Sequence, residues 1–184
     1  MKRVLFILGV LEDEDIDWLV TIGDRQEIAQ GTTLIQEGVP TDAIYILLEG
    51  ILHVCVSSLK HQVIARLSTG EVVGEMSFVD RRPPSATVEA ATSSLVLTIP
   101  RQALSQKLEQ DLGFAARFYR ALAILLSSRL RGMIQQLDEA SQWQPLELSP
   151  TDLNGEMDIS LAAIRFDWLL RRLRDGDIGQ SARS

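Results

Sequence analysis

The chain has one cysteine and two histidines among its 184 residues. Cys55 alone excludes a disulfide within one chain and any metal or iron–sulfur site that needs several cysteines. It lies in the alternating run 52–56, so we expect a buried, inert thiol. His53 and His61 fall in separate runs, and no serine–histidine–acid or paired-carboxylate arrangement accompanies them. The sequence therefore predicts no catalytic residue and no metal ligand.

The chain also lacks an excess of positive charge and a long apolar segment. Its formal net charge is −7, which argues against direct DNA binding because phosphate contacts supply most of that affinity. Residues 1–8 begin like a signal peptide, but the acidic run 12–15 follows at once without a small-residue cleavage pattern. No other apolar run approaches the roughly 20 residues of a membrane span. We expect a soluble, cytoplasmic protein.

Hydrophobic periodicity divides the rest of the chain into helical and β-rich parts. Helical spacing behind an acidic first turn predicts short N-terminal helices within 11–29. From Gly31 to Pro100, short β-rich runs are separated by glycines. These runs are 33–35, 43–48, 51–56, 63–67 and 86–99. Many short strands with glycine turns indicate a mainly β fold, a small sandwich or jelly roll.

After the β-rich part the pattern becomes helical again. A short segment with Leu104 and Leu108 precedes a long helix, about 111–137, without proline. Two apolar ladders with a seven-residue period run along this helix, and Phe114, Phe118, Leu122 and Leu125 occupy adjoining positions. The ladders are Tyr119, Leu126 and Met133, and Ala123, Leu130 and Leu137. We expect them to form a homodimer seam flanked by Arg117, Arg120, Arg129 and Arg131; a simple cap on the chain's own barrel is the alternative.

The C-terminal part predicts a linker and one more helix. Prolines and Asn154-Gly155 mark 143–155 as a linker. The helix, about 160–174, has an apolar stripe and a basic face, which suits a partner, an anionic membrane surface or the chain's own domain. The terminal 175–184 has a composition typical of disorder. We therefore divide the chain into a domain over 1–140 and a linker with an amphipathic helix over 141–184.

The segment 74–90 carries the most specific pattern in the chain. A Gly74-Glu75 pair lets the backbone approach a ligand while the carboxylate accepts a bond from a hydroxyl, and the 85–87 run offers amides of the kind that form anion nests. This segment resembles the phosphate-binding cassette of cyclic nucleotide-binding domains. Residues of the preceding strands extend the resemblance, which covers about 11–137: Gly31, Leu34, Glu37-Gly38, Asp42, Tyr45-Ile46-Leu47 and Glu49-Gly50. It implies a double-stranded β-helix flanked by N-terminal helices and a long C-terminal helix.

The resemblance also implies a ligand site for cyclic AMP or cyclic GMP. In it, Glu75 accepts the ribose 2′-hydroxyl, and amides of Ser77, Ser85 and Ala86 face the cyclic phosphate. The full set of implied ligand-binding residues is Gly74, Glu75, Met76, Ser77, Arg82, Ser85, Ala86 and Thr87. The arginine that pairs with the phosphate in the family is replaced by Pro84, so either Arg82 or Arg81 substitutes for it or binding is weak. A solvated turn is the favoured interpretation for both arginines, because Pro83-Pro84 stiffens the chain.

Taken together, these patterns predict a cytoplasmic, dimeric regulatory protein that binds a cyclic nucleotide weakly and signals through a protein partner. The alternative is a jelly roll that has lost its ligand and serves as a dimeric interaction module. A metalloenzyme of the cupin type is excluded because its paired histidines are missing. The segment after Leu137 is too short for the winged helix-turn-helix of the family's transcription factors, so direct operator binding is not expected.

Overall fold

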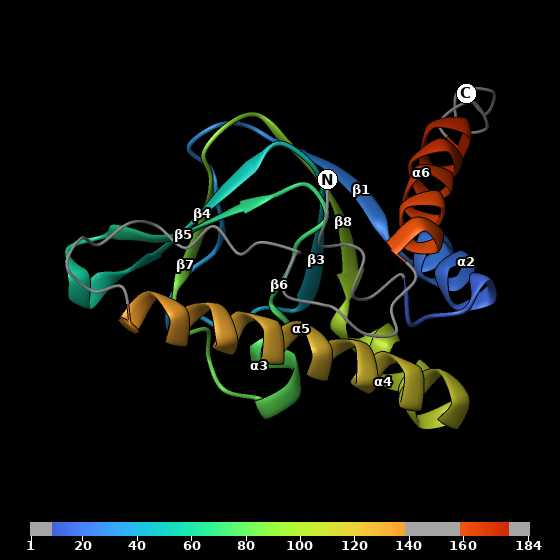
Figure 1. Ribbon diagram of the computed structural model, residues 1–184. Helices are drawn as coiled ribbons and strands as arrows, with labels where there is room; N and C mark the ends of the chain where they lie inside the picture. Colours follow the sequence, from blue (N-terminus) through green and yellow to red (C-terminus); the bar gives the residue numbers. More distant parts are fainter. Residues whose placement is uncertain (1–8, 139–158, 177–184) are drawn as a thin grey trace.

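The computed structural model describes residues 9–138 and 159–176 (Figure 1). The first helix, α2 (Asp13–Ile22), begins with a capping box in which the Glu12 amide donates to Asp15 Oδ2 at 2.8 Å. It ends at Gly23, where a Cβ atom would lie 2.7 Å from a methyl carbon of Leu97.

The N-terminal prediction of helix over 11–29 is wrong in its last part. Residues 24–28 form strand β1 (Asp24–Ile28), which pairs antiparallel with β8 (Ser94–Pro100). Asp-Arg-Gln-Glu-Ile has no apolar face of its own, so its conformation is set by this pairing with a distant strand. Local periodicity contains no information about such a partner.

Two four-stranded antiparallel sheets form the jelly roll that the sequence predicted. One sheet has the order β1-β8-β3-β6 and the other β2-β7-β4-β5. The remaining strands are β2 (Thr33–Ile35), β3 (Ala43–Glu49), β4 (Ile51–Val56), β5 (Gln62–Ser68), β6 (Val72–Val73) and β7 (Thr87–Ala90), with a 3-10 turn η1 (Ser57–Leu59) after β4. The predicted run 86–99 is two strands rather than one, because a turn at 91–93 moves the chain from one sheet to the other.

Three more helices lie outside the two sheets. They are α3 (Glu75–Asp80), α4 (Arg101–Gln110) and α5 (Leu112–Asp138), and α5 lies across the sandwich with α3 next to it (Figure 1). Phe114, Phe118, Leu122 and Leu125 are all buried on the side of α5 that faces its own domain. The rings of Phe114 and Phe118 stack with centroids 5.6 Å apart, and Phe118 meets Phe78 of α3 edge to face. These aromatic contacts fix α5 to α3.

The last helix, α6 (Ile159–Gly176), lies beside α2 (Figure 1). Phe166 and Leu169 are buried in the same apolar cluster as Ile16 and Leu19 of α2. Of the three roles left open for this helix, the structure shows packing onto its own domain. The helix also continues to 176, so residues 175 and 176 are helical rather than disordered; the predicted linker 143–155 and the rest of the tail lie outside the described residues.

Candidate functional site

The cassette, residues 74–87, begins at a glycine that no other residue can replace without strain. Gly74 has φ +88°, and a Cβ atom there would lie 2.9 Å from the carbonyl oxygen of Ala43. The left-handed backbone and this close approach turn the chain from β6 directly into α3. Glu75, the first residue of α3, is thereby placed against the body of the domain.

Glu75 is buried, with only 2% of its surface exposed, and its carboxylate is held by the long helix. Arg129 of α5 donates from Nη1 to Glu75 Oε1 and from Nη2 to the carbonyl of Val72 at 2.6 Å. A second buried carboxylate, that of Glu71, lies 3.6 Å from Arg129 Nη2. The carboxylate expected to accept a ribose hydroxyl is therefore already bonded to a guanidinium from α5.

Arg129 is not among the site residues predicted from the sequence. The structure differs from the prediction that Arg117 and Arg129 flank a dimer seam, because both are directed into their own domain. The helical spacing 118, 122, 125, 129 continues the buried face of α5 to Arg129. That register was the available signal, since an arginine at the end of a buried stripe needs an acidic partner.

The second half of the cassette keeps its backbone amides available. Pro84 is buried and its carbonyl accepts a bond from the Gly38 amide at 2.8 Å. The hydroxyl of Thr87 accepts a bond from the Glu37 amide at 3.1 Å, which anchors the start of β7. Ser85 is exposed and Ala86 is half-buried. Within the described ranges 9–138 and 159–176, neither of their amides donates to a protein acceptor.

The other predicted site residues take different positions. Met76 is exposed on α3, whereas Ser77 is buried and its carbonyl accepts a bond from Arg101 Nη2 at 2.9 Å. The Arg101 guanidinium also lies over the Phe78 ring, 5.6 Å from its centroid. The structure does not place Arg82 with Glu75: its side chain is 82% exposed and its Nε lies 4.0 Å from Asp80 Oδ2. The interpretation of Arg82 as a solvated turn residue therefore describes its observed position.

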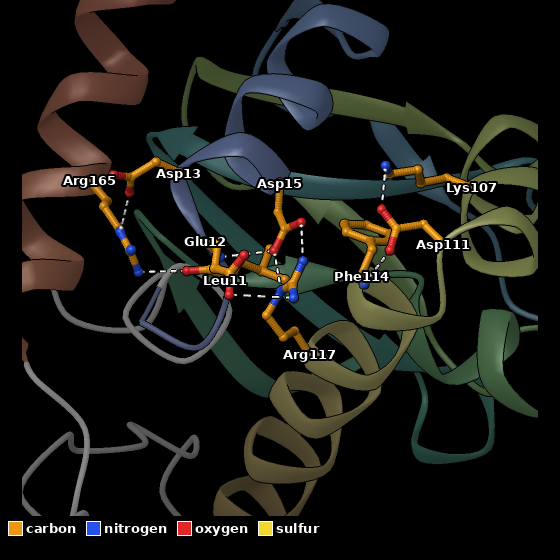
Figure 2. Close-up of polar contacts among 9 residues, drawn as sticks. All are labelled: Leu11, Glu12, Asp13, Asp15, Lys107, Asp111, Phe114, Arg117 and Arg165. Atoms are coloured by element: carbon orange, nitrogen blue, oxygen red, sulfur yellow. Dashed lines mark hydrogen bonds and ion pairs between the residues drawn. The ribbon is translucent and has the colours of Figure 1, made fainter.

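A second polar cluster joins α5 to α2 far along the same helix (Figure 2). Arg117 donates from Nε to Asp15 Oδ2 at 2.6 Å and from Nη2 to Oδ1 at 2.8 Å. Burial of Asp15 raises its pKa, but the bonds from Arg117 and from the Glu12 amide outweigh this, so the pKa lies below its ordinary value. The same contact raises the pKa of Arg117. This bidentate pair fixes the N-terminal helix to α5.

Neighbouring contacts extend this cluster to both sides. Asp111 caps α5 by accepting a bond from the Phe114 amide at 2.9 Å and pairs with Lys107 at 2.8 Å (Figure 2). These two bonds lower the pKa of Asp111, with the Lys107 bond as the larger cause. Arg165 of α6 donates to Asp13 Oδ1 at 2.8 Å and to the carbonyl of Leu11 at 2.5 Å. Helices α5, α2 and α6 are thus tied together by two arginines.

The outer face of α5 is apolar and exposed. Tyr119, Ala123, Leu130 and Met133 lie in solvent, Leu130 with 59% of its surface exposed, and Leu126 between them is half-buried. These are the residues of the two predicted ladders; the side chain of Leu137 lies outside the described part of the structure. The helix therefore carries one face for its own domain and an apolar face with no partner among the described residues.

The described residues contain few other groups that could bind a metal or react. Within 9–138 and 159–176, no three His, Cys, Asp or Glu side chains gather in a way that would hold a metal ion. Cys55 is buried, and burial followed by the neighbouring Glu89 carboxylate raises the pKa of its thiol. None of the described helices is long and apolar enough to cross a membrane.

Comparison with known proteins agrees with this architecture. Residues 25–111 match the family model described as "Cyclic nucleotide-binding domain". A cyclic nucleotide-binding domain from Methylobacillus flagellatus superposes with a TM-score of 0.67 at 24% identity, over 77% of this chain and 85% of that one. The catabolite activator protein of Thermus thermophilus superposes with a TM-score of 0.59 at 22% identity, over 91% of this chain and 85% of that one.

Curated relatives are longer proteins. An uncharacterised NTE family protein of Mycobacterium tuberculosis is 28% identical over 120 residues, which is 65% of this chain. The chain spans about a fifth, 20%, of the length of this relative. The match of residues 25–111, the two sheets in jelly-roll order and the Gly74-Glu75 entry to α3 agree: this part of the chain matches the cyclic nucleotide-binding domain family in sequence and in fold.

Proposed function

We propose that this chain is a cytoplasmic regulatory protein that binds a cyclic nucleotide, cAMP or cGMP, weakly at the cassette and signals through a protein partner. The observation that carries the proposal is the bond between Arg129 of α5 and Glu75 of α3. A ribose hydroxyl that bonds to Glu75 must share or displace this guanidinium. Occupation of the cassette and the position of α5 are therefore thermodynamically linked.

Through this linkage, a ligand bound at the cassette would change the surface of the molecule. Helix α5 carries Arg129 at the cassette and Arg117 at the contact with α2, and its exposed apolar face runs from Tyr119 to Met133. A shift of α5 that follows loss of the Arg129–Glu75 bond would alter the surface offered to a partner. We propose that this partner includes a second copy of the chain along α5, which would make the signalling unit a homodimer.

Weak binding follows from the residue at position 84. A bond between an arginine and a phosphate is charge-assisted, and loss of one partner of a buried charge pair costs about 2–5 kcal/mol. Pro84 offers no side-chain donor, and its backbone nitrogen has no hydrogen. The amides of Ser85 and Ala86 are then the principal donors that the second half of the cassette presents.

Titration calorimetry of the full chain with cAMP and with cGMP tests the proposal. We expect dissociation constants that are micromolar or weaker. Glu75→Gln should lose binding, because a side-chain amide accepts a hydrogen bond from the ribose hydroxyl more weakly than a carboxylate does. Glu27→Gln, at an exposed position on β1, is the matched control and should bind as the wild type does. Tight binding that survives Glu75→Gln would contradict the proposed site.

A second candidate function is a ligand-free interaction module. The observation that favours it is the closed state of Glu75, which is buried and already bonded. Under this interpretation the Arg129–Glu75 pair is a permanent structural contact. Absence of binding heat with any ribose-bearing probe, together with a stable dimer, would favour this candidate over a sensor.

A further inference from the structure

We propose that Glu37 is a positioning residue for the second half of the cassette, which it connects to the tip of the β4–β5 hairpin, residues 57–61. The inference rests on the proposed function in one respect, namely that the amides of Ser85 and Ala86 contact the ligand. Glu37 lies outside the set of site residues predicted from the sequence. It is part of a turn between β2 and β3 that makes hydrogen bonds to both the cassette and the hairpin tip.

The turn holds the cassette at two points. The Gly38 amide donates to the Pro84 carbonyl at 2.8 Å, and the Glu37 amide donates to Thr87 Oγ1 at 3.1 Å. These two contacts enclose residues 85–86, whose amides donate to no protein acceptor within the part of the chain that the structure describes. The turn therefore fixes both ends of the short segment that presents these amides to a ligand.

The side chain of Glu37 fixes the turn to a third element of the fold. Its Oε2 accepts a bond from the Ser57 amide at 2.8 Å. Ser57 is the first residue of η1, so the carboxylate satisfies an amide that has no acceptor within its own helical turn. The bond from the Ser57 amide, followed by one from its side chain, lowers the pKa of Glu37. The carboxylate is therefore ionised at neutral pH and acts as an acceptor only.

Packing restrains the turn little. Gly38 and Val39 are exposed, Val39 with 49% of its surface, and a Cβ atom at Gly38 would meet nothing within 4 Å. The turn is closed by a bond from the Val39 amide to the Gln36 carbonyl at 3.2 Å. A segment with few buried apolar contacts opens locally at a small cost in free energy. The Glu37–Ser57 bond reduces this opening, and with it the movement of the cassette segment that the turn holds.

Titration calorimetry of the full chain with cAMP and with cGMP tests the inference. A ligand that needs the ordered cassette binds more weakly in proportion to the fraction of molecules in which the cassette is ordered. We expect Glu37→Ala to raise the dissociation constant about fivefold, the effect of one typical hydrogen bond. Glu37→Gln keeps an acceptor for the Ser57 amide and should restore most of the affinity. Glu27→Ala removes a carboxylate from an exposed position of β1 and should bind as the wild type does.

A variant on the other side of the bond separates this contact from other effects of Glu37. Ser57→Pro removes the amide donor, and proline is tolerated at the first position of a helical turn. It should weaken binding about as much as Glu37→Ala, and the double variant should lose no more than either single one. Additive losses would overturn the inference, because they would show that the two residues act separately. If Ser57→Pro does not fold, as judged by its thermal unfolding, the comparison of Glu37→Ala with Glu37→Gln decides.

Hydrogen exchange of the Gly38 amide, followed by NMR, gives a measurement that does not depend on a ligand. This amide donates to Pro84, so it should exchange faster in Glu37→Ala than in the wild type and in Glu37→Gln. If the wild type binds a cyclic nucleotide and Glu37→Ala binds it equally well, the inference is overturned and the proposed function stands. If the wild type binds neither nucleotide, the proposed function fails. The exchange then decides alone, and equal rates at Gly38 in the wild type and Glu37→Ala would overturn the inference.

Discussion

Arg129 and Glu75, 54 residues apart, meet between the long helix and the first turn of α3, and the Arg129 guanidinium bonds at the same time to the Val72 carbonyl. Both side chains are largely buried, Glu75 almost completely. Removal of one member of a buried pair leaves an uncompensated charge, which costs about 3–5 kcal/mol, whereas removal of both is much less harmful. The pair therefore contributes to stability as well as to the linkage proposed above.

We expect Arg129→Ala to lower the free energy of unfolding by about 3 kcal/mol, because it leaves the buried Glu75 carboxylate without its main donor. Glu75→Gln combined with Arg129→Ala should recover part of this loss, with a coupling of about 1–3 kcal/mol in a double-mutant cycle measured by urea unfolding. Additive effects of the two single changes would show that the pair is not a mutual contact in solution.

The Asp15–Arg117 pair predicts acid sensitivity. The pKa of Asp15 in the folded chain lies below its ordinary value, so the folded state favours the ionised carboxylate. The stabilisation is complete above the unfolded pKa and is lost as the pH falls through the folded pKa. We expect Asp15→Asn to lower stability by about 2 kcal/mol at neutral pH, the contribution of hydrogen bonds to a charged group, and to reduce the loss of stability in acid.

Thermal unfolding from neutral pH to below the ordinary pKa of aspartate measures this dependence. Asp24→Asn, on an exposed residue of β1, is the control for removal of a carboxylate. If the wild type and Asp15→Asn lose stability in parallel as the pH falls, Asp15 is not responsible for the acid sensitivity.

The exposed ladders of α5 predict a homodimer. Burying Leu130, Met133 and their neighbours removes large apolar side chains from water, at roughly 1.5–3 kcal/mol each. Replacement of Leu126 and Leu130 by glutamate should give a folded monomer by light scattering, because the charges would be buried in the seam. Gln102→Glu, at an exposed position of α4, adds charge outside the seam and should leave the dimer intact. A wild type that is monomeric at high micromolar concentration would contradict the seam.

Gly74 and Gly38 form a matched pair for testing the entry to the cassette. Both have positive φ, but a Cβ atom at Gly74 would approach the Ala43 carbonyl to 2.9 Å, whereas one at Gly38 would meet nothing within 4 Å. Gly38→Ala should cost about 1 kcal/mol from the backbone conformation alone. Gly74→Ala should cost more, and it should also abolish ligand binding because α3 must shift. Equal costs in urea unfolding would show that the close approach is relieved without displacement of α3.

Because α6 is docked on its own domain, alanine substitutions of a buried and of an exposed aliphatic residue on this helix should differ in their effect on stability. Leu169→Ala removes a buried side chain next to α2, and such changes cost about 2–5 kcal/mol when the surroundings do not collapse. Ile164→Ala, at a residue that is 65% exposed, should cost little. Limited proteolysis should then cleave α6 faster in Leu169→Ala than in the wild type. Equal cleavage in the wild type and both variants would contradict stable docking of the helix.

Much of the fold was predictable because its signals are local. The strands around 33–35, 43–48 and 51–56, the helix containing Leu104 and Leu108, and the long helix have clear periodicity and glycine or proline boundaries, and the structure confirms them. Strand β1 and the two-residue β6 were missed because each is defined by its partner, β8 for one and β3 for the other. Such pairing over long sequence separations leaves no local pattern.

The site was predictable only on the cassette side. Gly74 and Glu75 could be singled out because their residue types and order are restrictive, and the structure shows Gly74 in the conformation that only glycine adopts easily. Arg129 could not be assigned from the same reasoning, because the sequence allows two positions for it. It could flank a dimer seam, or it could lie at the end of the buried face of α5. The rotation of α5 against α3 decides between these positions, and the Phe78–Phe118 contact fixes that rotation.

The strand order has a consequence for the rates at which backbone amides exchange with solvent. Strands β3 and β8 are adjacent in the middle of their sheet, and Ile44, Leu97 and Ile99 on them are almost completely buried. The cassette, by contrast, leaves this frame through β6, an edge strand of two residues. Amides of β3 and β8 should exchange only through global unfolding, while those of Ser85 and Ala86, which have no protein acceptor among the described residues, should exchange without any opening of the structure. The N-terminal end of the cassette is thus attached to the most persistent part of the domain by one of its shortest strand pairings.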